Sequence, residues 1–181
     1  MFVNESQKHP QCPLRLHVSP LSAQNGQLAM GGRRFACQIG RTGRTALKRE
    51  GDGATPIGRW PLLSVLYRAD RVMRPKTRLP VHIIRTDDGW CDEPLDRNYN
   101  RPVKLPYPAS AEKMWRDDRA YDLVVVLDYN FSRRSMNKGS AIFLHLSHND
   151  QRPTAGCLAF GEDDLRQILR LAPLGSIIDI Q

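Results

Sequence analysis

A histidine and a cysteine toward the C-terminal end of the chain have the residue types and spacing of a catalytic pair. His145 lies in the apolar run 140–147, and Cys157 follows it after the polar loop 149–153. Because side chains alternate along a strand, Phe143 and His145 are expected to share one face. The loop contains turn-forming residues and is long enough to let the chain fold back. Cys157 can therefore approach His145.

This pairing suits nucleophilic catalysis. A cysteine attacks as the thiolate, and a neighbouring imidazole can take its proton. Gly156 permits close backbone approach, so the N–H groups around Ala155, Gly156 and Cys157 could face a developing oxyanion. An isolated cysteine is more often a small buried hydrophobic residue, and an isolated histidine on an apolar strand is more often a core residue. The spacing alone leaves both interpretations open.

The wider motif resembles the L,D-transpeptidases of the YkuD type. It consists of a strand with His145, a polar loop, Thr154-Ala-Gly-Cys157 and a second apolar strand. Upstream blocks resemble the shorter branch of this family: Gly40-Arg-Thr-Gly43, Lys48-Arg-Glu-Gly-Asp52, Thr55-Pro-Ile-Gly58, Gly89-Trp-Cys-Asp92, Tyr99-Asn-Arg-Pro102 and Ser110-Ala-Glu112. The resemblance extends from about Leu14 to Ile180. It implies Cys157 as nucleophile, His145 as base and Gly156 as part of the catalytic motif.

Three positions depart from the family pattern. Leu146 replaces the glycine after the histidine, Ala155 replaces a second histidine, and Ala159 stands where an arginine is usual. Some enzymes of this branch join stem peptides through L-alanine at position 1 of the donor. The resemblance therefore implies either a 1,3-type cross-link or the more common 3,3-type.

Two groups of side chains are candidates to bind the substrate. They are Ser147, His148, Arg152, Thr154 and Ala155 near the catalytic pair, and Trp90, Asp92, Tyr99 and Asn100 in the irregular segment 68–108. Arg152 could take over the carboxylate contact of the missing arginine. Trp90 and Tyr99 could instead pin the segment to the core. Asp92 and Asn100 could bind a stem amine or simply make turns.

The composition limits the partners. A net charge of +8 invites a nucleic-acid role, but the basic residues are scattered and no nucleic-acid-binding motif accompanies them. No apolar stretch approaches the roughly 20 residues needed to span a bilayer. A zinc site of His145, His148 and Cys157 lacks the usual spacing and a fourth ligand. The family resemblance implies peptidoglycan stem peptides as partners, and we expect no cofactor, metal, nucleic acid or membrane span.

The N-terminal segment and the cysteines bear on location. Residues 1–13 are polar and lack the apolar core of a secretory signal, so a flexible tail is expected before one catalytic domain over 14–181. The family resemblance implies a periplasmic or cell-wall site of action. If Cys157 is a free nucleophile, at most one disulfide remains, and Cys12 with Cys37 is a candidate pair.

The remaining pattern predicts a mainly β fold. Strands are expected at 14–18, 34–39, 60–67, 122–130 and 176–180, with a hairpin turn at Asn25-Gly26. Helices are expected at 110–118 and from Glu162 to about Ala172. Together with the resemblance, this predicts a sandwich or partly open barrel of mixed sheets with two or more short helices, and the cysteine at its mouth.

The predicted reaction is acyl transfer in two steps. The cysteine forms a thioester with a donor stem, and the amine of a second stem resolves it. A peptidase or amidase would use the same two residues with water as acceptor. A catalytically idle wall-binding module is the third alternative.

Overall fold

The computed structural model describes residues 14–19, 21–148 and 150–181, so the predicted tail lies outside the described residues. Eight strands form a closed barrel, in the order β11-β12-β13-β3-β2-β1-β14-β6, because β6 also pairs with β11. These strands are β1 Leu14–Ser19, β2 Ser22–Met30, β3 Arg33–Gln38, β6 Gly58–Tyr67, β11 Leu123–Leu127, β12 Phe143–Leu146, β13 Leu158–Phe160 and β14 Ile177–Ile180. Pairs β1–β14 and β12–β13 are parallel and the other barrel pairs are antiparallel, which confirms the expected mixed, mainly β architecture.

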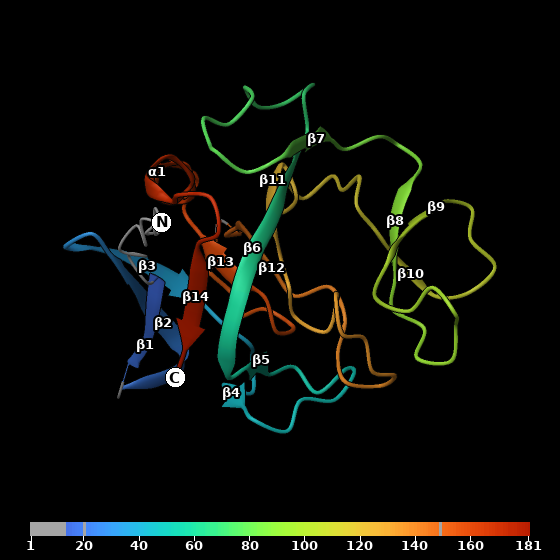
Figure 1. Ribbon diagram of the computed structural model, residues 1–181, viewed down its shortest axis with the longest axis horizontal. Helices are drawn as coiled ribbons and strands as arrows, with labels where there is room; N and C mark the ends of the chain where they lie inside the picture. Colours follow the sequence, from blue (N-terminus) through green and yellow to red (C-terminus); the bar gives the residue numbers. More distant parts are fainter. Residues whose placement is uncertain (1–13, 20, 149) are drawn as a thin grey trace, which may run out of the picture.

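The alternation of side chains on β12 decides which residues fill the barrel. Leu144 and Leu146 belong to the large core cluster inside it, whereas Phe143 belongs to a second cluster on the outer face. The helix α1, Glu162–Leu171, adds Leu165, Ile168 and Leu169 to the first cluster (Figure 1). Burial of these apolar faces is the main favourable term that closes the barrel.

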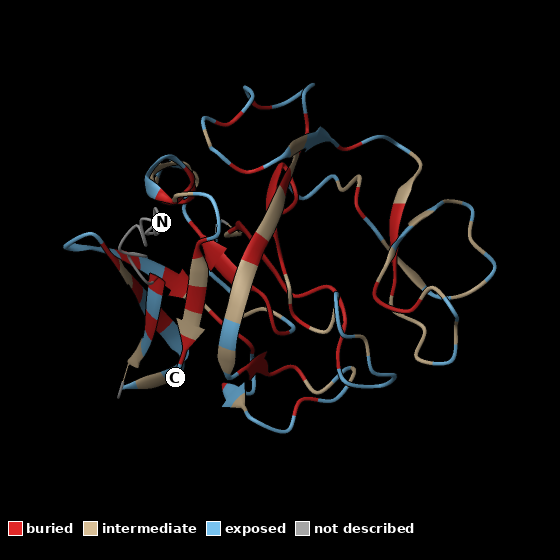
Figure 2. Ribbon diagram, in the orientation of Figure 1, coloured by how far each residue is buried: buried red, intermediate tan, exposed pale blue. Residues whose placement is uncertain are grey.

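The outer face of β11 and β12 is covered rather than exposed. All five residues of β11 are buried, as the red colouring in Figure 2 shows. A three-stranded sheet of β8 Asp88–Cys91, β9 Pro102–Lys104 and β10 Ala111–Lys113 lies on that side (right in Figure 1). Trp90 of β8 and Met114, directly after β10, pack into the second cluster with Val124 and Phe143. β11 and β12 are therefore covered on both faces, and strands of this kind have sequences that are apolar at nearly every position.

Shorter strands complete the structure. β7, Val81–Ile83, pairs in parallel with the end of β6, and β4 Arg44–Thr45 pairs with β5 Thr55–Pro56. No helix among the described residues is long and apolar enough to cross a membrane.

The predicted helix at 110–118 is wrong, and α1 is the single α-helix of the described residues. Ala111–Lys113 instead forms β10, which pairs antiparallel with Gly89–Cys91. Met114 N then donates to Asp88 O at 3.0 Å. Pairing with β8 thus overrides a helical preference that is only a weak prior over so few residues.

The predicted hairpin turn at Asn25-Gly26 is also wrong. Both residues lie within β2, where Gly26 pairs with Val18 on one side and Cys37 on the other. A Cβ at Gly26 would lie 3.0 Å from Leu16 Cδ1 and 3.2 Å from Cys37 Sγ. The glycine is therefore needed because neighbouring side chains approach the backbone closely, which is a common reason for a glycine inside a strand.

Candidate active site

A cleft of about 430 Å³ opens between the barrel wall and the small sheet. It is lined by Lys48, Glu50, Gly51, Asp92, Glu112, Arg116, Ala120, Tyr121, Ser140, Ala141, Ile142, His145, His148, Pro153, Thr154, Ala155 and Cys157. The structure thus brings the predicted pair, His145 and Cys157, to one cavity. Parallel pairing of β12 with β13 is the reason, because it places two segments twelve residues apart side by side.

Two main-chain groups hold the thiol of Cys157. Sγ donates to Ala141 O at 3.1 Å and accepts from Phe143 N at 3.3 Å. Gly156, just before it, has φ of 142°, and a Cβ there would lie 2.8 Å from Ala54 O. Only glycine fits this close approach without displacing the neighbouring backbone.

Burial dominates the acidity of this thiol. Cys157 is 7% exposed, and its removal from water raises the pKa to about 12, with the Glu112 carboxylate adding to the increase. The N–H of Phe143 acts in the opposite direction by favouring the thiolate. The resting nucleophile is therefore the neutral thiol.

The imidazole of His145 is fixed at one nitrogen. Nδ1 lies 2.8 Å from Leu146 O, and since a carbonyl only accepts, Nδ1 carries the proton and Nε2 is left as the basic nitrogen. The ring packs edge-on against Tyr121 at 5.4 Å between centroids. The main-chain carbonyl of Leu146 is therefore the group that orients the ring.

Burial also changes the pKa of His145, but it lowers this pKa where it raises that of Cys157. It is 6% exposed, and loss of hydration lowers the pKa to about 4, while the Leu146 carbonyl partly opposes this. The ring therefore stays neutral at pH 7. Before substrate binds, Cys157 is therefore a neutral thiol and His145 a neutral imidazole.

The loop before Cys157 is held by threonine side chains. Thr154 Oγ1 donates to Cys157 O at 2.7 Å and accepts from Gly156 N at 3.1 Å. Thr55 Oγ1 donates to Gly156 O at 2.9 Å. The Gly156 N–H, one of the expected oxyanion donors, thus bonds to Thr154.

Glu112, Arg116 and Tyr121 line the cleft and lie outside the predicted site residues. Tyr121 donates to Glu112 Oε1 at 2.7 Å, and Arg116 Nη1 lies 3.4 Å from the same oxygen. Burial raises the pKa of Glu112. Glu112 belongs to the block Ser110-Ala-Glu112 that resembles the family, and this block is a signal that could have indicated it, whereas Arg116 and Tyr121 belong to no such block.

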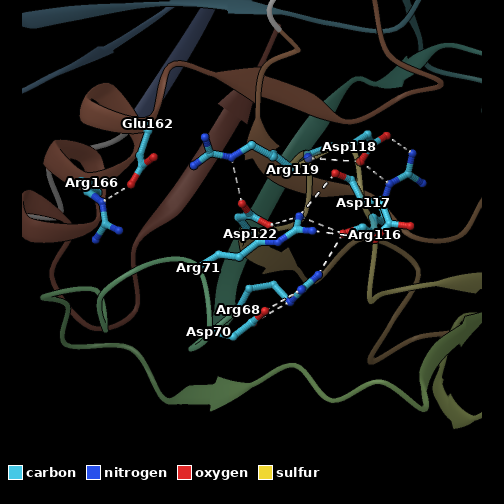
Figure 3. Close-up of polar contacts among 11 residues, drawn as sticks. Arg68, Asp70, Arg71, Arg116, Asp117, Asp118, Arg119, Asp122, Glu162 and Arg166 are labelled. Atoms are coloured by element: carbon cyan, nitrogen blue, oxygen red, sulfur yellow. Dashed lines mark hydrogen bonds and ion pairs between the residues drawn. The ribbon is translucent and has the colours of Figure 1, made fainter.

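An array of ion pairs fixes the segment that carries these residues (Figure 3). Asp122, 1% exposed, lies 3.3 Å from Arg71 Nη1 and 3.2 Å from Arg119 Nε. Arg116 is paired with Asp118 in the same view, and Arg68 Nη1 donates to Arg116 O at 2.8 Å. Because Asp122 directly precedes β11, these contacts anchor the cleft wall to the barrel.

The rest of the cleft is rich in carboxylates. Lys48 is paired with Asp52, and Glu50 accepts a hydrogen bond from Tyr99 Oη. Asp92 Oδ1 is buried and has no hydrogen-bond partner among the described residues. Those residues contain no group of three or more His, Cys, Asp or Glu placed to hold a metal ion.

The model of the YkuD family, the L,D-transpeptidase catalytic domain, matches residues 20–180. The chain belongs to this family. No curated protein and no solved structure matches it. Membership implies a cysteine enzyme that cross-links peptidoglycan, and hence an extracytoplasmic, cell-wall location.

Not all predicted substrate contacts of this transpeptidase lie in the cleft. Thr154, Ala155, His148 and Asp92 line it, whereas Ser147 and Arg152 line an adjoining groove of about 620 Å³ that shares His148. Arg152 Nη2 lies 3.2 Å from His148 Nδ1.

Trp90, Tyr99 and Asn100 are buried and do not belong to the cleft lining. Trp90 Nε1 donates to Asn100 Oδ1 at 2.9 Å, and Tyr99 bonds to Glu50. These contacts fit the alternative in which the three residues pin the long segment to the core. Of the cysteines, Cys37, Cys91 and Cys157 are free, while the predicted pairing of Cys37 with Cys12 lies partly outside the described residues.

His145 should make the stability of the transpeptidase fall in acid. Its unfolded pKa of 6.5 exceeds the folded value of about 4, so only the unfolded chain gains a proton between these values. Stability from this group is complete above pH 6.5 and decreases by about 3 kcal/mol as the pH falls to 4. Urea unfolding at pH 7 and pH 4 should show this loss in the parent and not in His145→Gln. An equal loss in both proteins would contradict the assignment.

Proposed function

We propose that Cys157 is the nucleophile and His145 the general acid–base of this peptidoglycan transpeptidase, within one catalytic domain over 14–181. The observation that carries the proposal is that both side chains line one cleft while His145 Nδ1 is bound to Leu146 O. Nε2 is then the nitrogen available to exchange protons with the thiol and the substrate. A base oriented by a third group is the recognised arrangement for an activated nucleophile.

The reaction is a double displacement. Cys157 Sγ attacks a carbonyl of the donor stem as its proton passes to His145 Nε2, and the imidazolium then protonates the leaving amine. A thioester remains. The diaminopimelate amine of a second stem attacks the thioester, and His145 Nε2 takes up the amine proton. Sγ leaves as the thiolate, and the imidazolium of His145 returns the proton to it.

In the free enzyme the proton stays on the thiol, and it passes to His145 only as Sγ attacks the substrate. With a thiol pKa of about 12 and an imidazole pKa of about 4, the separated thiolate and imidazolium are disfavoured before substrate binds. Substrate dipoles and the Phe143 N–H can stabilise the thiolate as it forms. The buried site also limits water, the competing acceptor.

The charges in the cleft support an altered donor register. Among the described residues that line it, the lysine and arginine side chains are Lys48 and Arg116, and both are already paired, with Asp52 and Asp118. Ala159, at the position where the family has an arginine, has no charged group, and Arg152 lines the adjoining groove and not the cleft. Losing a charge-assisted pair costs about 1.5–3 kcal/mol. This favours attack at L-alanine 1, giving a 1,3-linked product, over the 3,3-type that recognises a terminal D-alanine carboxylate.

The carboxylates suit the cationic part of a stem peptide. Asp92 has an oxygen without a partner among the described residues, and Glu50 and Glu112 line the same cleft. An ammonium group would satisfy Asp92 and reduce repulsion among the three acids. We assign Asp92 to bind a diaminopimelate ammonium. This requires a periplasmic or wall-facing enzyme with access to stem peptides.

The two histidines should rank clearly in kinetics. His145→Ala should lower the rate of acyl transfer by about 10² to 10⁴, as expected for a general acid–base group. His148→Ala should lower it much less, because His148 lies at the cleft edge and contacts Arg152. Single-turnover release of the donor's leaving group measures both. The opposite ranking would move the base into the loop.

Product analysis should identify the bond attacked. The protein is incubated with purified disaccharide-tetrapeptide, and dimers are sequenced by tandem mass spectrometry, with Cys157→Ala as the inactive control. We expect 1,3-linked dimers and release of a diaminopimelate-containing peptide. Single D-alanine with 3,3-linked dimers would contradict the altered register but not the transpeptidase. Shortened monomers alone would favour the peptidase or amidase, and muropeptide binding without turnover would favour a wall-binding module.

A further inference from the structure

The carbonyl that accepts from the nucleophile belongs to a residue with an unusual backbone. Ala141 precedes β12 and has φ of 51°, in the left-handed region that non-glycine residues seldom adopt. It is 8% exposed, and its O lies 3.1 Å from Cys157 Sγ. Such a conformation persists only where surrounding contacts hold it.

Those contacts come from the side chain of Asn100. Its Oδ1 accepts from Ala141 N at 3.0 Å and from Trp90 Nε1 at 2.9 Å. Its Nδ2 donates to Asn130 O at 2.7 Å and Tyr129 O at 3.1 Å. Two acceptor and two donor sites are thereby filled, which completes the capacity of an amide. Asn100 is 1% exposed and has nothing left to offer a substrate.

We infer that Asn100 is a positioning residue for the nucleophile, acting on Cys157 Sγ through the main chain of Ala141. The amide joins three segments: the chain after β8, the turn after β11, and the approach to β12. By binding the Ala141 N–H, it sets the direction of the adjoining peptide and so of the carbonyl that holds the thiol. This inference rests on the proposed role of Cys157 and replaces the predicted substrate contact of Asn100.

The shape of the site explains why an asparagine is suited to this position. Asn100 itself has φ of 54°, which asparagine tolerates better than most residues. An aspartate would turn an oxygen toward the carbonyls of Tyr129 and Asn130, and a leucine would leave four polar groups unsatisfied. Without the amide, Ala141 can relax toward negative φ and turn its carbonyl away from Sγ.

Replacement of Asn100 by glycine tests this, because glycine keeps the left-handed backbone and removes only the amide. Folding is checked by circular dichroism and thermal melting. Alkylation of Cys157 by iodoacetamide at pH 7.5 is followed by peptide mass spectrometry, and acylation by disaccharide-tetrapeptide is measured in single turnovers. We expect alkylation to become at least about fivefold faster, since the thiol loses its carbonyl partner, and acylation to become about 10- to 100-fold slower, with KM nearly unchanged. Should Asn100→Gly not fold, Asn100→Ser takes its place.

Asn130→Gly is the matched control. Asn130 also has a left-handed backbone, with φ of 48°, but its Nδ2 bonds Gly139 O and Ser135 O instead of Ala141. Its replacement should leave alkylation within about threefold of the parent. Equal effects of both replacements, or a raised KM with unchanged acylation in Asn100→Gly, would overturn the proposal. Alkylation tests the positioning of the thiol even if this donor does not acylate the parent protein. Failure of the proposed function is thereby distinguished from failure of the inference about Asn100.

Discussion

Packing of the small sheet against the outer wall of the barrel is the contact on which the site depends. Phe143 lies at its centre, edge-on to Trp90 at 5.0 Å and to Tyr121 at 5.9 Å between ring centroids. Such pairs add about 0.5–1.5 kcal/mol to the burial of the rings. Cys157 belongs to the same cluster, and His145 follows Phe143 on the same face of β12. The contact that stabilises the fold thus also removes both reactive groups from water.

This removal from water determines the electrostatics. It holds the thiol and the imidazole in their neutral forms, raising the pKa of one and lowering that of the other. The surrounding charges are balanced locally, with Lys48 on Asp52 and Arg116 on Asp118. The unpartnered oxygen of Asp92 is the exception within the described cleft. These charges are the basis for the proposed binding of a substrate ammonium at Asp92.

Local patterns predicted the parts of this site that local rules control. Strand alternation correctly separated Phe143 from Leu144 and Leu146, and the strand expected at 122–130 is present as β11, Leu123–Leu127. The α1 helix was evident from its apolar spacing. The segment 110–118 was assigned to a helix because its partner strand, Gly89–Cys91, is distant in sequence and could not be inferred from it.

The roles of Asn100 and Tyr121 depend on contacts between distant segments. Asn100 reaches Ala141 forty-one residues away, and Tyr121, just before β11, packs on His145 of the neighbouring strand β12. Polar groups satisfied across such distances have no spacing signature. The family motif in the sequence indicated Cys157 and His145 as the catalytic pair, but it does not contain the residues that orient them.

The central claim is that Cys157 forms the covalent intermediate, and trapping that intermediate tests it most directly. Parent protein mixed with disaccharide-tetrapeptide is quenched in acid within one turnover, and the intact mass and the peptic peptides are recorded. We expect an adduct of a donor acyl fragment, sensitive to hydroxylamine as a thioester, on the peptide that contains Cys157. An adduct on Cys37 or Cys91, or product formation with no adduct at any time point, would contradict it.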